Sequence, residues 1–234
     1  KWHEKAPEGK LDLLVTLDFR MSTTALHSDI VLPAASWYEK NDLSTSDMHP
    51  FIHPFASAVD PVWGSRTDWD IYKGLARKFS EIVPAHLGKE KDIVMLPLQH
   101  DSPMETSETA KAEDWKETGE ELKPGKNMSK IVPVERNYPE TYNRFTSLGP
   151  LMDKAGNGAK GISWNTEEEV ELLKKLNKTS NNQGETHGRP RIETDINAAE
   201  VVLSLAPETN GNVATKAWKA LEQTTGRKHT HLVE

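Results

Sequence analysis

The stretch Leu11–His53 constrains the fold of this 234-residue chain more than any other part of its sequence. It opens with a near-continuous apolar run, Leu11–Leu17, which is typical of a buried strand in a parallel sheet. Ser22–Thr24 offer helix caps, and Asp29–Pro33 reads as a second short strand that ends at proline. Two strands joined by a helical crossover form a βαβ unit, so the sequence predicts an α/β fold with a parallel sheet.

Polar residues follow both predicted strands. The first strand runs into the turn Asp18–Arg20, and Trp37–Lys40 comes shortly after the second. Ligands of open parallel sheets bind at the carboxyl ends of the strands, where an acidic side chain accepts hydrogen bonds from a nucleotide. A helix-capping or turn role for Asp18 is the competing interpretation, and the sequence alone leaves both open.

Composition narrows the classes of partner and cofactor. The formal net charge of −7 argues against nucleic acid, because a phosphate-binding surface needs a concentrated basic face. The absence of cysteine excludes any disulfide, cysteine-bound zinc or iron–sulfur cluster held by this stretch. The hydrophobic fraction of 35% is low, as expected for a piece whose other faces are covered by further chain. No apolar run approaches the roughly 20 residues that span a bilayer.

Apolar residues at three- and four-residue spacing predict four longer helices. These are expected over residues 67–83, 166–178, 197–205 and 213–224. Thr67 or Asp68 caps the first, Asn165 caps the second, and Gly226 ends the last. Shorter pieces are expected as well: a short strand or buried run at Ile93–Leu96, buried structure at Ile131–Val134, and a short helix over Thr141–Leu148.

The remaining segments are expected to be irregular. Residues 34–65 read as a long loop that covers a ligand, because such loops in compact domains are usually functional. Residues 99–130 read as a polar, exposed insertion and residues 178–190 as a polar linker. Most tryptophans are interpreted as core or interface residues, namely Trp37, Trp63, Trp69, Trp164 and Trp218.

The spacing of the histidines does not predict a metal site. His49 and His53 have the four-residue spacing of a helical metal pair. Pro50 and Pro54 argue against a helix there, so the spacing loses its meaning and no metal ligand is predicted. Glycine-rich phosphate loops and Ser/His/Asp patterns are absent from the sequence, and no catalytic residue is predicted.

Several motifs together resemble a known family, the molybdopterin oxidoreductases of the dimethyl sulfoxide reductase family. The shared motifs are the strand end Leu17-Asp18, the turn Ser22–Thr24, the strand Asp29–Pro33 and Trp37–Lys40. A narrower similarity, to alpha subunits of respiratory, membrane-bound nitrate reductases, rests on Thr45–Pro54, Tyr142–Ser147, Gly156–Gly158, Leu205–Gly211 and Thr225–His231. The similarity covers nearly the whole chain and implies an internal fragment of a far longer subunit.

The resemblance implies a cofactor and a different role for each part of the chain. Residues 1–98 would be an α/β, parallel-sheet part that binds a molybdopterin dinucleotide, and 131–234 a helical, loop-rich part packed on the remaining subunit. The cofactor would be molybdenum bis(molybdopterin guanine dinucleotide), with its guanosine end near Leu17, Asp18, Lys40 and Asp68. Ligands of molybdenum and of a 4Fe-4S cluster would lie outside this stretch. After the Trp-x-Glu motif the chain departs from the wider family, so no site is carried over to residues 41–54.

The resemblance also implies a reaction and partners. The parent enzyme would reduce nitrate to nitrite with electrons from quinol, in anaerobic respiration. An iron–sulfur beta subunit and a haem-containing gamma subunit would hold it at the cytoplasmic face of the bacterial membrane. Two alternatives stay open: a nitrite oxidoreductase alpha subunit running the reverse reaction, and a non-catalytic subunit-interaction module. A formate or selenate enzyme fits Thr45–Pro54 less well. We expect the isolated chain to be inactive, because the molybdenum and cluster ligands lie elsewhere.

Overall fold

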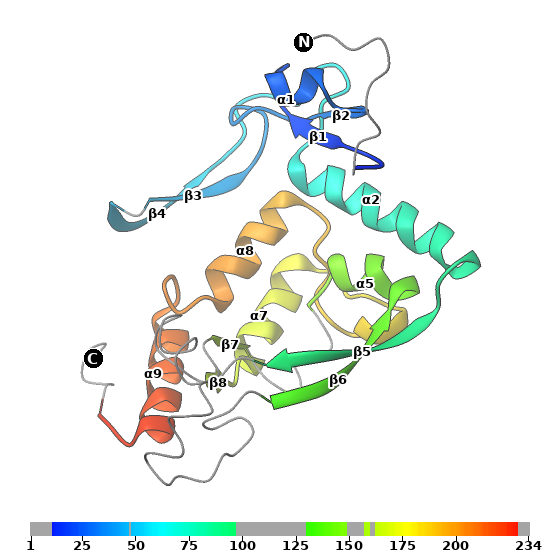
Figure 1. Ribbon diagram of the computed structural model, residues 1–234. Coiled ribbons are helices and arrows are strands. Elements are labelled where there is room, and N and C mark those ends of the chain that lie inside the picture. Colours follow the sequence, from blue (N-terminus) through cyan, green and yellow to red (C-terminus); the bar gives the residue numbers. More distant parts are fainter. Residues whose placement is uncertain (1–10, 47, 97–129, 149–156, 160–161, 229–234) are drawn as a thin grey trace, which may run out of the picture. The chain divides into compact units, whose positions relative to one another are not determined.

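The computed structural model describes residues 11–46, 48–96, 130–148, 157–159 and 162–228 (Figure 1). Its contacts divide the chain into two compact units. Unit 1 comprises residues 1–75 and 194–199, and unit 2 comprises residues 76–193 and 200–234. The division predicted from sequence, at residues 98 and 130, stays a prediction. The predicted polar insertion lies almost wholly outside the described residues.

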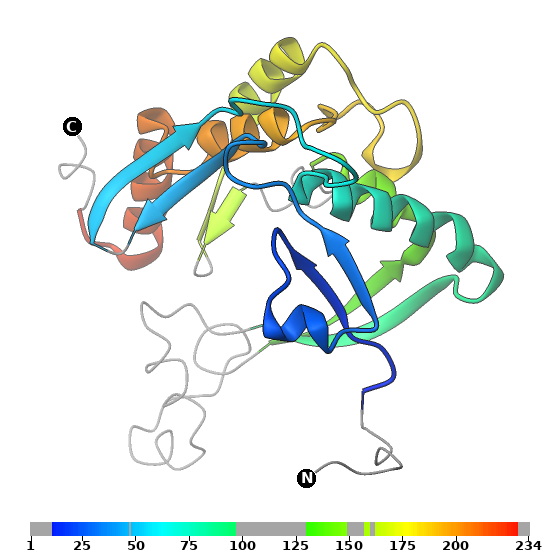
Figure 2. The same cartoon turned by 90° about the horizontal axis from the view of Figure 1, so that it is seen from above.

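Unit 1 contains the predicted βαβ motif. Strand β1, Val15–Asp18, pairs in parallel with β2, Ile30–Pro33, in a register that sets Val15 opposite Ile30 and Asp18 opposite Pro33. The crossover holds the short helix α1, Thr23–Leu26, and Figure 2 shows the two strands side by side. Ser22 caps this helix, since its Oγ accepts a hydrogen bond of 3.4 Å from the Ala25 N–H. The predictions of both strands, the cap and the parallel pairing are confirmed.

The predicted burial of the first strand is wrong. Leu11 and Leu13 precede the strand and keep 76% and 58% of their surface exposed, and Val15 keeps 38%. A parallel strand is buried only where layers cover both of its faces. In the described residues β1 and β2 form a sheet of two strands, which leaves this apolar run uncovered.

Residues 34–65 are not the irregular loop that the sequence predicts. Strands β3, Asp42–Ser46, and β4, His49–Phe55, form an antiparallel hairpin with a register shift between Ser44 and Ser46. Proline is tolerated in edge strands, where its missing N–H costs no ladder bond, so the prolines of β4 do not prevent pairing. Figure 1 shows the hairpin as a long ribbon extending from the βαβ motif.

Helix α2, Asp68–Ile82, confirms the predicted helix and its cap. The Thr67 Oγ1 accepts a hydrogen bond of 3.1 Å from the Asp70 N–H, and a short 3-10 turn, η1, Val83–Ala85, follows the helix. Its apolar stripe is only partly covered: Ile71 and Ala76 are buried, but large side chains on the stripe are not. The exposed members are Tyr72 at 51%, Leu75 at 47% and Phe79 at 42%.

Unit 2 combines two hairpins with helices. Strands β5, Lys89–Leu96, and β6, Lys130–Asn137, pair antiparallel, as do β7, Asn157–Ala159, and β8, Ile162–Trp164. The helical elements are η2, Tyr138–Glu140, α5, Thr141–Phe145, α7, Glu167–Asn177, η3, Gly184–Thr186, and α9, Gly211–Thr225. Helix α8, Asp195–Leu205, has its residues 195–199 in unit 1 and the rest in unit 2. The predicted helices are confirmed, with small shifts of their ends. The short strand predicted at Ile93–Leu96 is confirmed as part of β5, where Ile93 is 74% exposed, but the burial predicted for Ile131–Val134 is wrong at Val134, which is 39% exposed.

Helix ends in unit 2 follow local rules. Thr166 occupies the N-cap position of α7, one residue after the predicted cap, while the Asn165 Oδ1 accepts a hydrogen bond of 2.9 Å from the Glu167 N–H. Gly226 ends α9 with φ 69°, a left-handed conformation that glycine adopts without strain. Leu173 on α7 and Val213 on α9 are fully buried.

Residues 178–190 follow α7 as a polar connection, as predicted, but three of their polar side chains are buried. Asn181, Thr186 and Arg189 are 3%, 0% and 7% exposed. The Asn181 Nδ2 donates to the Thr186 Oγ1 at 2.5 Å, and that hydroxyl donates to the Asn143 carbonyl at 3.3 Å. Polar groups are buried where such bonds satisfy them, which composition does not reveal. None of the described helices is both long and apolar enough to cross a membrane.

Candidate functional site

The candidate site is a cleft of about 460 Å³ in unit 1, at the carboxyl ends of β1 and β2. The four residues singled out from sequence, Leu17, Asp18, Lys40 and Asp68, all line it. The rest of the lining comes from segments next to these four in sequence: Phe19, Ala34, Ala35, Ser36, Trp37 and Tyr38. The structure therefore brings together residues that are up to 51 positions apart, from Leu17 to Asp68.

Backbone hydrogen bonds fix the floor of this cleft. The Ala34 N–H donates to the Asp18 carbonyl at 3.1 Å, which continues the β1–β2 pairing by one residue. The Ala35 N–H donates to the Arg66 carbonyl at 2.7 Å, and this joins the segment after β2 to the segment before α2. Asp18, Ala34 and the start of α2 are thus held together by the main chain.

Asp18 has the turn role weighed from sequence, and it also lines the cleft, where its role toward a nucleotide stays a prediction. Its Oδ1 accepts a hydrogen bond of 3.2 Å from the Arg20 N–H, so it stabilises the turn after β1. A hydrogen bond from the Ser22 side chain, then the Arg20 N–H, hold the pKa of the Asp18 carboxyl below its usual value. The side chain is half-buried and lines the cleft as a carboxylate, which accepts hydrogen bonds and donates none.

Lys40 is held between two carboxylates. Its Nζ lies 2.5 Å from the Asp68 Oδ2 and 3.3 Å from the Asp42 Oδ2, and its side chain is only 13% exposed. Burial by itself would lower the pKa of the Lys40 ammonium, but the hydrogen bonds and charges of Asp68 and Asp42 outweigh it and raise the pKa. An ammonium has three N–H donors, so one remains for an anionic ligand.

Two aromatic rings at this cleft were not assigned to the site from sequence. Phe19 and Trp37 line it with 57% and 69% of their surface exposed, and their ring centroids are 6.1 Å apart at 39°. Of the two roles predicted for Trp37 and Trp63, core or interface, the core role is wrong because both are exposed, and the interface role stays a prediction. Trp37 belongs to the Trp-x-Glu motif and Phe19 follows Asp18 directly, so proximity to the motifs was the available signal.

Glu39 holds the segment that carries Trp37. Its Oε2 accepts a hydrogen bond of 2.8 Å from the Ser36 N–H, and its Oε1 accepts one of 3.3 Å from the Val62 N–H. The bond from Ser36 is the main cause that keeps the pKa of the Glu39 carboxyl below its usual value. The glutamate of the Trp-x-Glu motif therefore supports the wall of the cleft.

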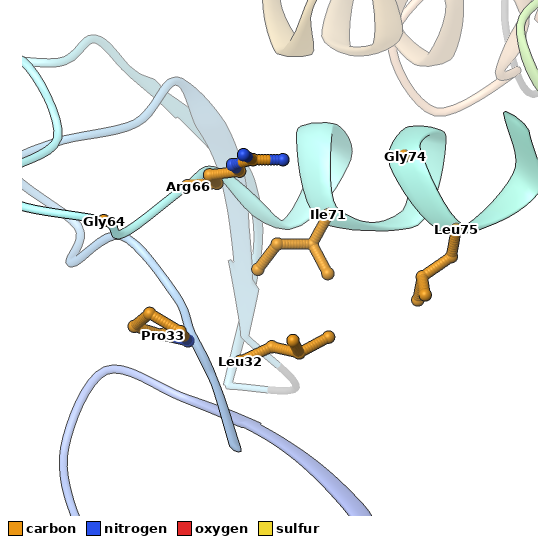
Figure 3. A pocket seen from close by; sticks show the side chains of 7 residues that line it. All are labelled: Leu32, Pro33, Gly64, Arg66, Ile71, Gly74 and Leu75. Atoms are coloured by element: carbon orange, nitrogen blue, oxygen red, sulfur yellow. The ribbon is translucent and has the colours of Figure 1, made fainter. Parts of the chain in front are cut away.

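A second cavity of unit 1, of about 390 Å³, differs in character. In Figure 3 the side chains of Leu32, Ile71 and Leu75 lie around a shared space between β2 and the start of α2. Its other lining residues are Pro33, Gly64, Arg66 and Gly74. Six of these seven residues are apolar or glycine, so this cavity suits an apolar group better than a polar nucleotide.

The chemistry of the first cleft fits the nucleotide end of a cofactor. Ligand pockets usually measure about 300 to 1,000 Å³, and 460 Å³ is enough for a nucleoside. Asp18 offers an acceptor for base N–H groups, and Lys40 offers a donor for a phosphate oxygen. The described residues contain no group of three His, Cys, Asp or Glu side chains that could hold a metal ion, and His53 lies on a strand, not a helix.

Comparisons with known proteins agree with the residues that carry the resemblance. Residues 1–78 match the family model described as molybdopterin oxidoreductase, and residues 155–234 match that described as nitrate reductase alpha chain, domain V. The chain is 63% identical to the respiratory nitrate reductase 2 alpha chain of Escherichia coli (strain K12), over 99% of this chain and 18% of that protein. It is 59% identical to the respiratory nitrate reductase 1 alpha chain of the same strain, with 99% and 18% covered.

A relative from another bacterium gives the same result. The chain is 46% identical to the nitrate reductase alpha chain of Bacillus subtilis (strain 168), over 100% of this chain and 19% of that protein. The chain thus spans about a fifth of the length of the curated relatives that it matches. It belongs to the molybdopterin oxidoreductase family and is similar, over its whole length, to the alpha chains of nitrate reductases.

Proposed function

We propose that this chain is part of the catalytic alpha subunit of a respiratory nitrate reductase, and that the cleft of unit 1 binds the guanine dinucleotide tail of its molybdopterin cofactor. The observation that carries the proposal is the meeting of Leu17, Asp18, Lys40 and Asp68 in one cleft of about 460 Å³. The similarity to nitrate reductase alpha chains, up to 63% identity, supports the wider assignment.

The three polar side chains take different roles in this proposal. The Asp18 carboxylate accepts hydrogen bonds from the ring N–H and the amino group of guanine, two neighbouring donors on one edge of the base. Lys40 directs its remaining N–H to a phosphate oxygen. Asp68, whose Oδ2 is 2.5 Å from the Lys40 Nζ, holds that lysine in place and keeps it charged. Trp37 and Phe19 offer flat apolar surfaces on which a base can stack.

In the parent enzyme, nitrate takes up two electrons and two protons and yields nitrite and water. The bound molybdenum pterin supplies the oxygen-atom transfer of this reaction. In this proposal, the residues of this chain hold the dinucleotide tail and thereby orient the cofactor. The proposal includes quinol as electron donor, a 4Fe-4S cluster elsewhere in the subunit, and beta and gamma partner subunits that hold the complex at the cytoplasmic face of the membrane.

The test uses the full-length alpha subunit in its complex. Asp18→Ala and Lys40→Ala are compared with Glu171→Ala, which removes an exposed partner of Lys174 on α7. Molybdenum and the guanine nucleotide released by acid are measured per purified subunit. We expect both to fall in the first two variants and to stay at the wild-type level in the third. Full cofactor content in Asp18→Ala and Lys40→Ala would contradict the proposed cleft.

The same preparations separate the alternatives. A non-catalytic interaction module predicts no molybdenum in the wild-type subunit. A nitrite oxidoreductase predicts molybdenum, but faster turnover of nitrite than of nitrate when electron acceptors and donors are supplied in turn. The isolated 234-residue chain is expected to show no nitrate reduction with a viologen donor.

A further inference from the structure

We propose that Asp195, at the start of α8, is a positioning residue for the nucleotide cleft. It acts through Asn41, which it clamps beside Lys40. This inference rests on the function proposed for the cleft, and it assigns a role in that cleft to the C-terminal part of the chain. The motif residues that identify the cleft all lie within the first 68 residues, so Asp195 is far outside them in sequence.

The clamp consists of one carboxylate that holds both the main chain and the side chain of one residue. The Asn41 backbone N–H donates to the Asp195 Oδ2 at 2.8 Å. The Asn41 Nδ2 donates to the Asp195 Oδ2 at 3.2 Å and to its Oδ1 at 3.3 Å. Hydrogen bonds to a charged acceptor are stronger than neutral ones, and several of them on one residue fix its orientation.

Asn41 is also held from its other side. Its Oδ1 accepts a hydrogen bond of 3.2 Å from the Ser57 N–H, beyond the end of the β3–β4 hairpin. The amide side chain thus uses its donor toward Asp195 and its acceptor toward Ser57. Such a residue has one orientation, because a reversed amide would place N–H against N–H at Ser57.

The position of Asn41 determines that of Lys40. The two Cα atoms are separated by one trans peptide, about 3.8 Å, so anchoring the Asn41 N–H also anchors the Lys40 carbonyl. From there the Lys40 ammonium reaches Asp68 at 2.5 Å in the cleft, while Asp42 on the other side of Asn41 contacts the same ammonium at 3.3 Å. If Asn41 is no longer held, its neighbours Lys40 and Asp42 both become less fixed, and so do the contacts of the Lys40 ammonium.

Helix capping does not account for the clamp. The Thr194 Oγ1 accepts a hydrogen bond of 3.2 Å from the Asn197 N–H, which is the bond expected of an N-cap residue. The Asp195 Oδ1 accepts a local hydrogen bond of 2.9 Å from the Ile196 N–H, but its Oδ2 accepts twice from Asn41. Thr194 thus caps α8, whereas Asp195 holds Asn41. Thr194→Ala therefore serves as a matched control that removes the cap and leaves the bonds to Asn41.

The hydrogen bonds between Asp195 and Asn41 also explain why residues 194–199 group with unit 1 and not with their neighbours in sequence. Residues 194–199 belong to unit 1, although they lie within the stretch 155–234 that matches domain V of nitrate reductase alpha chains. A segment of that stretch thus supports the part of the chain that matches molybdopterin oxidoreductases. We infer that binding of the dinucleotide depends on both parts being present.

The experiment compares four variants of the full-length alpha subunit in its complex: Asp195→Ala, Asp195→Asn, Thr194→Ala and Asp195→Ala combined with Lys40→Ala. The readout is the guanine nucleotide retained per subunit after gel filtration, with melting temperature as a folding control. We expect the nucleotide retained by Asp195→Ala to fall at least about threefold below the wild type. The reason is that losing a charge-assisted hydrogen bond shifts the equilibrium of the loop away from its ordered form by about tenfold or more. Asp195→Asn keeps one acceptor for the Asn41 N–H and should recover part of the loss.

The control and the double variant identify the route of the effect. Thr194→Ala weakens the helix cap, so it should lower the melting temperature as much as Asp195→Ala while retaining the nucleotide. If Asp195 acts through Lys40, the double variant should lose no more nucleotide than Lys40→Ala alone. Additive losses, or equal nucleotide loss in Thr194→Ala, would overturn the inference.

Failure of the inference is distinguishable from failure of the proposed cleft. Loss of nucleotide in Asp18→Ala and Lys40→Ala but full retention in Asp195→Ala would remove the positioning role and leave the cleft intact. Full retention in all of these variants would remove both.

Discussion

Among the glycines whose surroundings the structure describes, Gly184, in the 3-10 turn η3, is the one where an added Cβ would meet neighbouring atoms within 4 Å. Its φ of +65° lies in the left-handed region, which costs a residue with a Cβ about 1 to 2 kcal/mol. A Cβ there would also lie 2.1 Å from the Glu140 Oε2 and 2.7 Å from the Asn143 Nδ2. Glu140 would have to move, although its Oε2 accepts hydrogen bonds from the Asn143 Nδ2 at 3.0 Å and the Glu185 N–H at 3.1 Å.

The expected cost of Gly184→Ala follows from these two effects. Two hydrogen bonds of about 0.5 to 1.5 kcal/mol each add to the backbone strain, which gives a loss of about 2 to 5 kcal/mol in the free energy of unfolding. Gly188→Ala is the matched control: its φ is +78°, but a Cβ there meets nothing within 4 Å. That variant should lose only the backbone part, about 1 to 2 kcal/mol.

Urea unfolding of both variants, followed by tryptophan fluorescence with wild-type chain alongside, measures the difference. The slope with urea should be unchanged, so the midpoints report stability directly. Equal losses in the two variants would refute the steric argument, because backbone strain would then account for the whole effect at Gly184. A loss confined to Gly188→Ala would contradict both parts of the reasoning.

Two further changes should affect unit 2 by electrostatics. Lys216→Met removes the cation 2.9 Å from the carboxylate of Glu169, whose side chain is only 7% exposed, so urea unfolding should show a loss of about 1 to 3 kcal/mol. Lys174→Met, at an exposed ion pair, should lose less than about 0.5 kcal/mol, and equal losses would contradict this account. Burial by itself would raise the pKa of the Glu185 carboxyl, but two side-chain hydrogen bonds and the charge of Arg144 outweigh it, and the pKa lies below the usual 4.5. This carboxyl therefore stabilises the fold at pH above 4.5, and the contribution is lost as pH falls through its lowered pKa. Melting temperatures measured between pH 7 and 3 should fall less steeply in Glu185→Gln than in the wild type, and identical slopes would refute the assignment.

Local signals predicted local structure well. The Ser22 and Thr67 caps, the proline after α2 and the glycine after α9 each satisfy or end backbone hydrogen bonding within a few residues, so they can be recognised without knowing the fold. The β3–β4 hairpin was missed because the prolines of β4 obscure its alternation, although an edge strand tolerates them. The wrong predictions of burial at Leu11 and Val134 have another cause: exposure depends on what packs against a side chain, and relatives of this chain are about five times longer.

At the candidate site, too, the sequence identified local motifs but not the contacts between distant residues. Motifs in the sequence identified Leu17, Asp18, Lys40 and Asp68, and the structure places all four around one cleft. Their function in cofactor binding stays a proposal. No pattern in the sequence indicated the Asp42 contact to Lys40, the exposed Trp37 ring or the hydrogen bonds that Glu39 accepts from the Ser36 and Val62 N–H groups. Each of them depends on the path of the chain after β2.

By itself, the sequence determined the family, the βαβ motif and the four residues of the cleft, since each is encoded by neighbouring residues. Only the tertiary structure decided which distant groups support that cleft. Asp195 lies 154 residues from Asn41, and no periodicity or spacing links them. Their hydrogen bonds exist because folding brings the start of α8 beside the segment after β2, and a carboxylate there satisfies N–H groups that would otherwise lack a partner.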